Sequence, residues 1–205
     1  SAASLDRAQG AWRGMRTEVI GGQILDISLE ASGDESIELA DKVNRYKTAA
    51  YTIERPLHLG AAIAGADTST IEAFRGYGRD IGIAFQLRDD ILGVFGDSAV
   101  TGKPAGDDLR EGKRTELFAT AVGLLAETDP DGAEELRAGI GQTADGARLR
   151  RLAQLIRGSG AEDAVEQRIE QLTASGLEYL EDAGINDAAV DALTALAHKA
   201  TDRRK

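Results

Sequence analysis

Apolar residues recur at helical spacing along almost the whole chain, and this pattern predicts an all-α fold. The first helix is expected over residues 5–31, ending near Gly33, and the second over residues 34–52. A break is expected before Pro56, because proline disfavours helical backbone in the residue that precedes it, and a short helix over 57–66 follows. The expected inward-facing residues are Trp12, Met15, Val19, Ile20, Ile24 and Ile27 in the first helix, and Ile37, Leu39, Ala40, Val43, Tyr46 and Ala50 in the second.

The next helix is expected to begin at Ser69, with Glu72 completing a capping box, and to reach about residue 94. Because it is apolar on several faces, we expect it near the middle of a helical bundle. Asp129-Pro130 and Asn186 are favourable helix starts in the second half of the chain. Amphipathic helices are expected there over residues 115–127, 131–141, 145–157, 160–183 and 186–200.

Composition narrows the possible partners. The chain has 205 residues, with 24 Lys and Arg against 35 Asp and Glu, a formal net charge of −11. An acidic chain without a basic block argues against nucleic acid and anionic membranes as main partners. With no cysteine, disulfides and thiolate metal sites are excluded, which fits a reducing cytoplasm. No apolar run approaches the roughly 18 residues of a membrane span, no signal peptide is visible, and the length favours one domain over 1–205.

The polar residues that interrupt the apolar helix of residues 69–94 are the strongest chemical signal. Asp89 and Asp90 are adjacent, and Gln86 shares their edge of the helix. A glycine-punctuated loop with Lys103 and Lys113 follows. Oxygen ligands without histidine or cysteine suit Mg²⁺ or Mn²⁺, while lysines and glycine amides suit a phosphate. The alternative for the two carboxylates alone is an ion pair with Arg88 or with a neighbouring helix.

Two further polar pairs are weaker signals. Gln23 and Asp26 lie on one helix face after Gly21-Gly22, and here a packing notch beside a solvated pair is an equal alternative. Lys47 and Thr48 lie late in a helix, where a lysine is often only a favourable charge near the negative helix end.

Taken together, these residues resemble the trans-isoprenyl diphosphate synthases (polyprenyl synthetases), such as geranylgeranyl and farnesyl diphosphate synthases. The match covers about residues 10–120, and its last two motifs are the specific ones. The matching motifs are Gly22-Gln23-x-x-Asp26, Lys47-Thr48, Phe85-Gln86-x-x-Asp89-Asp90-Ile91-Leu92 with Gly96-Asp97, and Gly102-Lys103-x-x-Gly106-x-Asp108 with Gly112-Lys113.

The resemblance implies an all-α, isoprenoid-synthase-like bundle around a central cavity, usually a homodimer, that condenses isopentenyl diphosphate with an allylic diphosphate. It implies that Asp89 holds Mg²⁺ with help from Asp90, and that Lys47 and Lys103 contact the allylic diphosphate. Thr48 and Gln86 would line the reacting centre. Lys113, Gln23 and Asp26 are implied as supporting polar contacts in substrate binding.

The sequence departs from the family in two places. Gly93 stands where the family's second motif has its third aspartate, and the first aspartate-rich motif is not found. The chain therefore resembles the C-terminal half to two-thirds of a synthase, and we expect it to be inactive alone. The other hypotheses are a non-catalytic partner subunit of a complete synthase and a helical interaction domain without a ligand.

Overall fold

A computed structural model describes residues 1–96, 105–142, 144–181 and 183–202, and the regular structure of these residues is helical, with no strand. The predicted all-α class is therefore confirmed. The helices in chain order are α1 (Ala2–Ser32), α2 (Ile37–Val43), η1 (Asn44–Glu54), α3 (Arg55–Ala64), α4 (Thr68–Phe95), α6 (Asp107–Glu111), α7 (Glu116–Thr128), α8 (Pro130–Gly139), α9 (Gly146–Gly158), α10 (Ala161–Glu181) and α11 (Asp187–Thr201). None of these helices combines the length and the apolar character that crossing a membrane requires.

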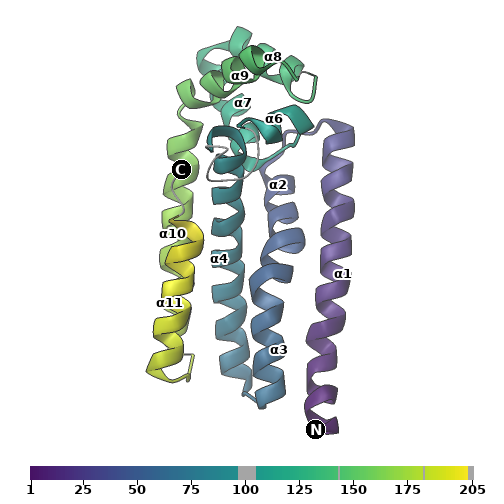
Figure 1. Ribbon diagram of the computed structural model, residues 1–205, viewed down its shortest axis with the longest axis vertical. Coiled ribbons are helices and arrows are strands. Elements are labelled where there is room, and N and C mark those ends of the chain that lie inside the picture. The colour runs from purple at the N-terminus through teal and green to yellow at the C-terminus, as the bar shows by residue number, and fades with distance from the viewer. Residues whose placement is uncertain (97–104, 143, 182, 203–205) are drawn as a thin grey trace. The chain divides into compact units, whose positions relative to one another are not determined.

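The chain forms two compact units. Unit 1 comprises the described residues of 1–26, 42–86 and 169–203, and unit 2 those of 27–41 and 87–168. Within unit 1, η1 and α3 lie between α1 and α4, and α10 and α11 cover the other side of α4 (Figure 1). A core of Tyr77, Ile81, Leu180 and Ala197 joins α4 to α10 and α11.

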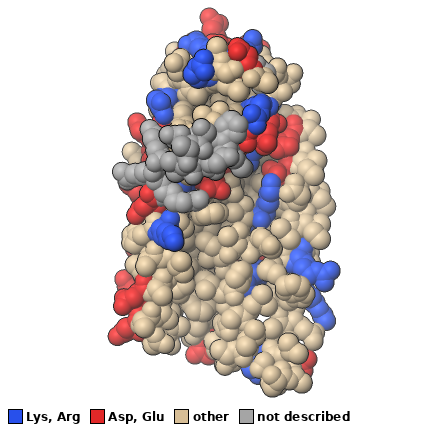
Figure 2. Space-filling model, in the orientation of Figure 1, with Lys and Arg blue, Asp and Glu red and all other residues tan. Residues whose placement is uncertain are grey.

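Helix α1 buries a narrower face than the sequence predicted. Ala8, Met15 and Gly22 are buried and lie seven residues apart, which places them on one helix face. Trp12, Ile20, Ile24 and Ile27, expected to face inward, are instead 50–60% exposed. Met15 was predicted correctly, but the rest of the buried face mixes Ala8 and Gly22 with Asp26 and Leu29, so the large apolar residues did not mark it. The face of unit 1 drawn in Figure 2 carries mostly uncharged side chains.

Residues 44–54 form a π-helix rather than the end of an α-helix. A π-helix joins residues five apart, and Asn44, Ala49 and Glu54, which have that spacing, are all buried. The change in period turns Tyr46 outward to 40% exposure, against our expectation; Ile37, in α2, is also exposed rather than inward-facing.

The expected break before Pro56 is also absent. Arg55, the residue before the proline, is helical, with φ −71° and ψ −35°, and its N–H donates to the carbonyl oxygen of Ala50. Pro56, which has no N–H to donate, follows directly in the first turn of α3. The chain thus passes from a π-helix to an α-helix without leaving helical backbone.

Helix α4 follows the predicted bounds, but its cap differs. Asp67, not Ser69, caps it: the Asp67 carboxylate accepts the N–H of Thr70 at 2.9 Å and the hydroxyl of Ser69 at 2.8 Å. A carboxylate at this position accepts both donors at once, which the capping box based on Ser69 did not anticipate.

In unit 2, helices α7, α8 and α9 pack around fully buried leucine side chains, among them Leu117, Leu136 and Leu152. The predicted bounds of α7 to α11 are reproduced within about two residues, with Asp129 and Asn186 as N-caps. The short helix α6, in a stretch expected to be loop, was not predicted. Glycines with positive φ flank it, Gly106 at 77° and Gly112 at 82°.

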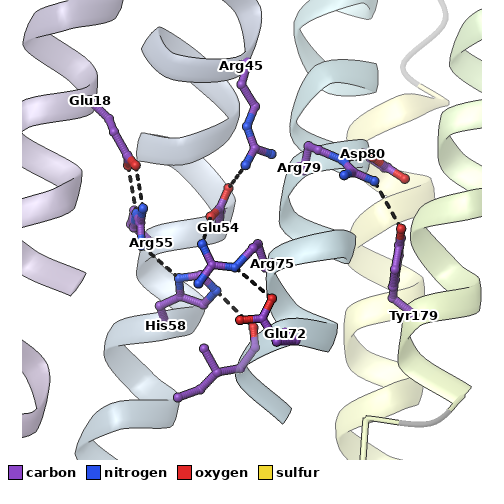
Figure 3. A network of polar contacts seen from close by, with 11 residues as sticks. Glu18, Arg45, Glu54, Arg55, His58, Glu72, Arg75, Arg79, Asp80 and Tyr179 are labelled. Atoms are coloured by element: carbon purple, nitrogen blue, oxygen red, sulfur yellow. Dashed lines mark hydrogen bonds and ion pairs between the residues drawn. The ribbon is translucent and has the colours of Figure 1, made fainter. Parts of the chain in front are cut away.

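A polar network is buried in unit 1 where η1 meets α3 (Figure 3). Glu54 is 1% exposed, and Arg45 lies 3.1 Å and Arg75 3.8 Å from its carboxylate. Burial raises the pKa of Glu54, and the nearby arginines only partly offset this. Arg55 pairs with Glu18 of α1 at 2.7 Å, so the network ties α1, η1, α3 and α4 together.

His58 belongs to the same network as a neutral side chain. Arg55 donates to its Nδ1 at 3.2 Å, so its Nε2–H donates to the carbonyl oxygen of Ile71 at 3.1 Å. Burial, followed by the charges of Arg55 and Arg75, lowers the pKa of His58 from 6.5 to about 4. These contacts make His58 a packed, hydrogen-bonded side chain of unit 1.

We expect His58→Gln to make the unfolding free energy depend less steeply on pH below pH 6.5. Between pH 6.5 and about 4 the imidazole is protonated in the unfolded chain but not in the folded chain. Stability is therefore lost as pH falls through this window, by about 2–3 kcal/mol. Urea unfolding at several pH values measures the slope. His198→Gln is the matched control, because the His198 side chain is 52% exposed; equal slopes for both variants would contradict the prediction.

Candidate functional site

The predicted site residues fall into two groups, one in each unit. In unit 1, the Lys47 ammonium pairs with the buried carboxylate of Asp26, and the Thr48 hydroxyl donates to Oε1 of Gln86 at 2.7 Å. Gln23, on α1, is exposed. The structure therefore joins four of these five predicted residues in two direct contacts, between η1 and its two neighbouring helices.

The glycine pair of α1 explains how Lys47 comes so close to that helix. A methyl group on Gly22 would lie 2.7 Å from the Cα of Lys47, which is too close for any side chain, whereas Gly21 faces open space. Of the two glycines, only Gly22 therefore forms the packing notch that the sequence allowed as an alternative to a ligand site. The notch and the ligand interpretation are compatible, since this close approach brings Lys47 to Asp26 one turn further along α1.

In unit 2, Asp90 and Asp108 share the ammonium group of Lys113. Its Nζ lies 3.0 Å from Oδ1 of Asp90 and 3.3 Å from Oδ2 of Asp108, and Asp90 is only 1% exposed. Burial alone lowers the pKa of Lys113, but the two carboxylates outweigh this and raise its pKa above the ordinary value. Asp90 is thus ion-paired, but with a lysine between α6 and α7 rather than with Arg88 or a neighbouring helix, the alternative that the sequence left open. Asp89 is partly exposed on the same helix.

Gly93, at the position where the family has a third aspartate, lies directly against Asp108. A methyl group built on Gly93 would collide with the carboxylate of Asp108, with Oδ1 at 2.8 Å. Asp108 is 8% exposed and held by Lys113. A carboxylate is therefore next to this point of α4, but it comes from α6. Spacing along the chain gave no role to Asp108, because α6 itself was not predicted.

Unit 2 contains two other ion pairs in which one partner is buried. Arg88 is 4% exposed and binds both carboxylate oxygens of Glu166, at 2.5 and 2.6 Å. Glu116 is 3% exposed and lies 3.0 Å from Arg168; burial raises its pKa to about 7. Neither Glu166 nor Glu116 was singled out in the sequence, because a paired or buried acid in an amphipathic helix looks like a surface residue there.

The donor atoms suit a hard cation. In the described part of the chain, no group of three or more His, Asp or Glu side chains could hold a metal ion by itself. Mg²⁺ characteristically takes one or two protein carboxylates and completes its shell with water and substrate phosphate. Asp89, partly exposed beside the buried Asp90, fits that pattern. Lys103 lies outside the described residues.

One surface groove of about 700 Å³ in unit 1 involves none of the predicted site residues. It lies between α4 and α10, and its wall includes Arg75, Arg79 and Tyr179. Arg79 donates to the Tyr179 hydroxyl at 3.1 Å, and Arg75 and Arg79 each pair with carboxylates (Figure 3).

Comparison with known proteins finds the same family that the sequence resembles. A family model described as polyprenyl synthetase matches residues 10–156. The chain is 42% identical over 149 residues to a geranylfarnesyl diphosphate synthase of Aeropyrum pernix, covering 72% of this chain and 44% of that protein. It is 35% identical over 188 residues to a (2E,6E)-farnesyl diphosphate synthase of Mycobacterium bovis, covering 91% and 52%.

A solved structure extends the likeness to the whole fold. A geranylgeranyl pyrophosphate synthase from Corynebacterium glutamicum, complexed with isoprenyl diphosphate and magnesium, superposes with a TM-score of 0.98 at 59% identity. The alignment covers 100% of this chain and 57% of that one. The chain thus spans about half the length of the curated relatives it matches.

Proposed function

We propose that this chain, which belongs to the polyprenyl synthetase family, carries the diphosphate-binding part of an enzyme that condenses isopentenyl diphosphate with an allylic diphosphate. The observation that carries the proposal is the pair of lysine–carboxylate groups at the family's motif positions, Lys47 with Asp26 and Lys113 with Asp90. The similar synthases named above, which act on or make prenyl diphosphates, support it.

The reaction has three steps. The allylic carbon–oxygen bond breaks and leaves a carbocation and inorganic pyrophosphate; the isopentenyl double bond attacks the cation; and a proton is then lost. Mg²⁺, when bound, neutralises charge that builds up on the departing pyrophosphate. We assign its protein oxygen ligand to Asp89, with Asp90 assisting.

The remaining residues act by position and charge. The ammonium groups of Lys47 and Lys103 would contact the diphosphate and stabilise its charge as it leaves. The oxygens of Thr48 and Gln86, already oriented by their mutual hydrogen bond, would face the developing cation. Asp26 would hold Lys47 in place and Lys113 would hold Asp90, and their ion pairs support these two roles. Gln23 would add a further polar contact in substrate binding.

A homodimer is part of the proposal as well. Large apolar side chains on α1, among them Trp12, Ile20 and Ile24, are at least half exposed, which favours a covering partner over bare solvent.

The experiment is a condensation assay combined with a binding assay on the 205-residue chain. Because the sequence lacks an Asp-Asp-x-x-Asp motif, we expect no product from isopentenyl and allylic diphosphates. We do expect inorganic pyrophosphate to bind in calorimetry with Mg²⁺ and to lose affinity when EDTA removes the metal. Robust condensation would contradict the predicted inactivity, and no Mg²⁺-dependent binding would contradict the proposed diphosphate site.

A further inference from the structure

The π-helix η1 is wedged between glycines of two neighbouring helices. On one side a methyl group on Gly22 of α1 would lie 2.7 Å from the Cα of Lys47. On the other side, a methyl group on Gly82 of α4 would lie 2.5 Å from the Cβ of Ala49, and one on Gly78 would lie 2.5 Å from the Cα of Glu54. Each of these contacts is too close for any side chain larger than hydrogen, and each falls on η1.

The spacing of the contacts matches the two helices turn for turn. Gly78 and Gly82 are four residues apart, one turn of an α-helix. Their partners Glu54 and Ala49 are five residues apart, the period of a π-helix. An α-helix in place of η1 would rotate one of these partners away from α4. Glycines in the interior of a helix such as α4 weaken that helix. Gly78 and Gly82 are explained by the space that they leave for the wider π-helical turn of η1.

Lys47 and Thr48 lie within this wedge. Gln86, which accepts the Thr48 hydroxyl, is one further turn along the same α4 face as Gly78 and Gly82. Asp26, which pairs with Lys47, is one turn beyond Gly22 on α1. The same two helix faces that press on the backbone of η1 thus also hold its two polar side chains.

We propose that Gly22 and Gly82 are positioning residues, which set the ammonium of Lys47 and the hydroxyl of Thr48 for the diphosphate by fixing the π-helical path between them. The inference rests on the proposed function, which assigns the diphosphate contact to these side chains. It goes beyond that assignment by tying substrate affinity to the backbone register of η1 rather than to the polar residues alone.

The test compares Gly82→Ala with Gly176→Ala in the same chain. Gly176 of α10 packs against the opposite side of α4, where a methyl group would lie 2.7 Å from Cδ1 of Ile81. Both variants overpack the interior of unit 1, and both are expected to lower the unfolding temperature. Only Gly82→Ala displaces η1, so only it should weaken Mg²⁺-dependent binding of inorganic pyrophosphate, by about tenfold in calorimetry. Equal affinities of the two variants overturn the proposal.

Two further variants separate the outcomes. In a Lys47→Ala/Thr48→Ala background, Gly82→Ala should have no additional effect on affinity, because the groups that it misplaces are gone; a full additional loss overturns the proposal. Should Gly82→Ala fail to fold, Ala49→Gly decides, since it opens the same contact without a clash. It should weaken binding about threefold, and unchanged affinity overturns the proposal. If Lys47→Ala/Thr48→Ala itself leaves binding intact, the proposed function fails instead.

Discussion

Asp89→Ala should weaken the Mg²⁺-dependent binding of inorganic pyrophosphate by about 100-fold, or about 2.7 kcal/mol. The reason is that Mg²⁺ binds to only one or two protein carboxylates. A water molecule can take the place of a lost carboxylate as a ligand, but it does not supply the negative charge. Asp89 is partly exposed, whereas its neighbour Asp90 is buried and paired with Lys113. Asp89 is therefore the better placed of the two to reach a cation at the surface of α4.

Calorimetry with pyrophosphate at fixed Mg²⁺ measures the effect. Asp163→Ala is the matched control, because Asp163 is an exposed aspartate in the first turn of α10 and belongs to neither group of site residues. Both variants should unfold within about 1 kcal/mol of the wild-type chain. Asp89→Ala binding as tightly as the control would remove Asp89 from the metal site.

The residues that the sequence identified most securely are those whose chemistry is local. Gln86, Asp89 and Asp90 could be placed on one edge of a helix because spacing alone decides which residues share a helix face. For the same reason the caps at Asp129 and Asn186 were predicted correctly, since a cap depends only on the next three residues.

The failures came from long-range packing. Nothing in the sequence of residues 44–54 distinguishes a π-helix from an α-helix, because the wider turn is stabilised by Gly78 and Gly82, at least 24 positions further along the chain. Asp108 was only a motif position without a role in the sequence, because its contacts with Lys113 and Gly93 depend on the unpredicted helix α6. The exposed apolar side chains of α1, such as Trp12, lie off a packed face that includes Gly22 and Asp26, and residue hydrophobicity does not reveal that face.

The second large effect is expected from Lys113, which the resemblance treats only as a supporting contact. In the structure its ammonium group forms ion pairs with two carboxylates, those of Asp90 at 1% and Asp108 at 8% exposure. Lys113→Met keeps much of the side-chain volume but leaves both carboxylates without that positive charge. Removing one partner from a buried ion pair costs far more than the pair contributes, so we expect a loss of about 3 kcal/mol in unfolding free energy.

Urea unfolding measures this loss, with Lys199→Met, at an exposed position near the end of α11, as the matched control. Adding Asp90→Asn to Lys113→Met should recover a large part of the stability, because the uncompensated buried charge is then removed. A purely supporting contact to substrate would behave differently: Lys113→Met would weaken pyrophosphate binding while unfolding like the control. Stability and affinity measured on the same variants therefore separate a lysine that holds the acidic motif together from one that serves only the ligand.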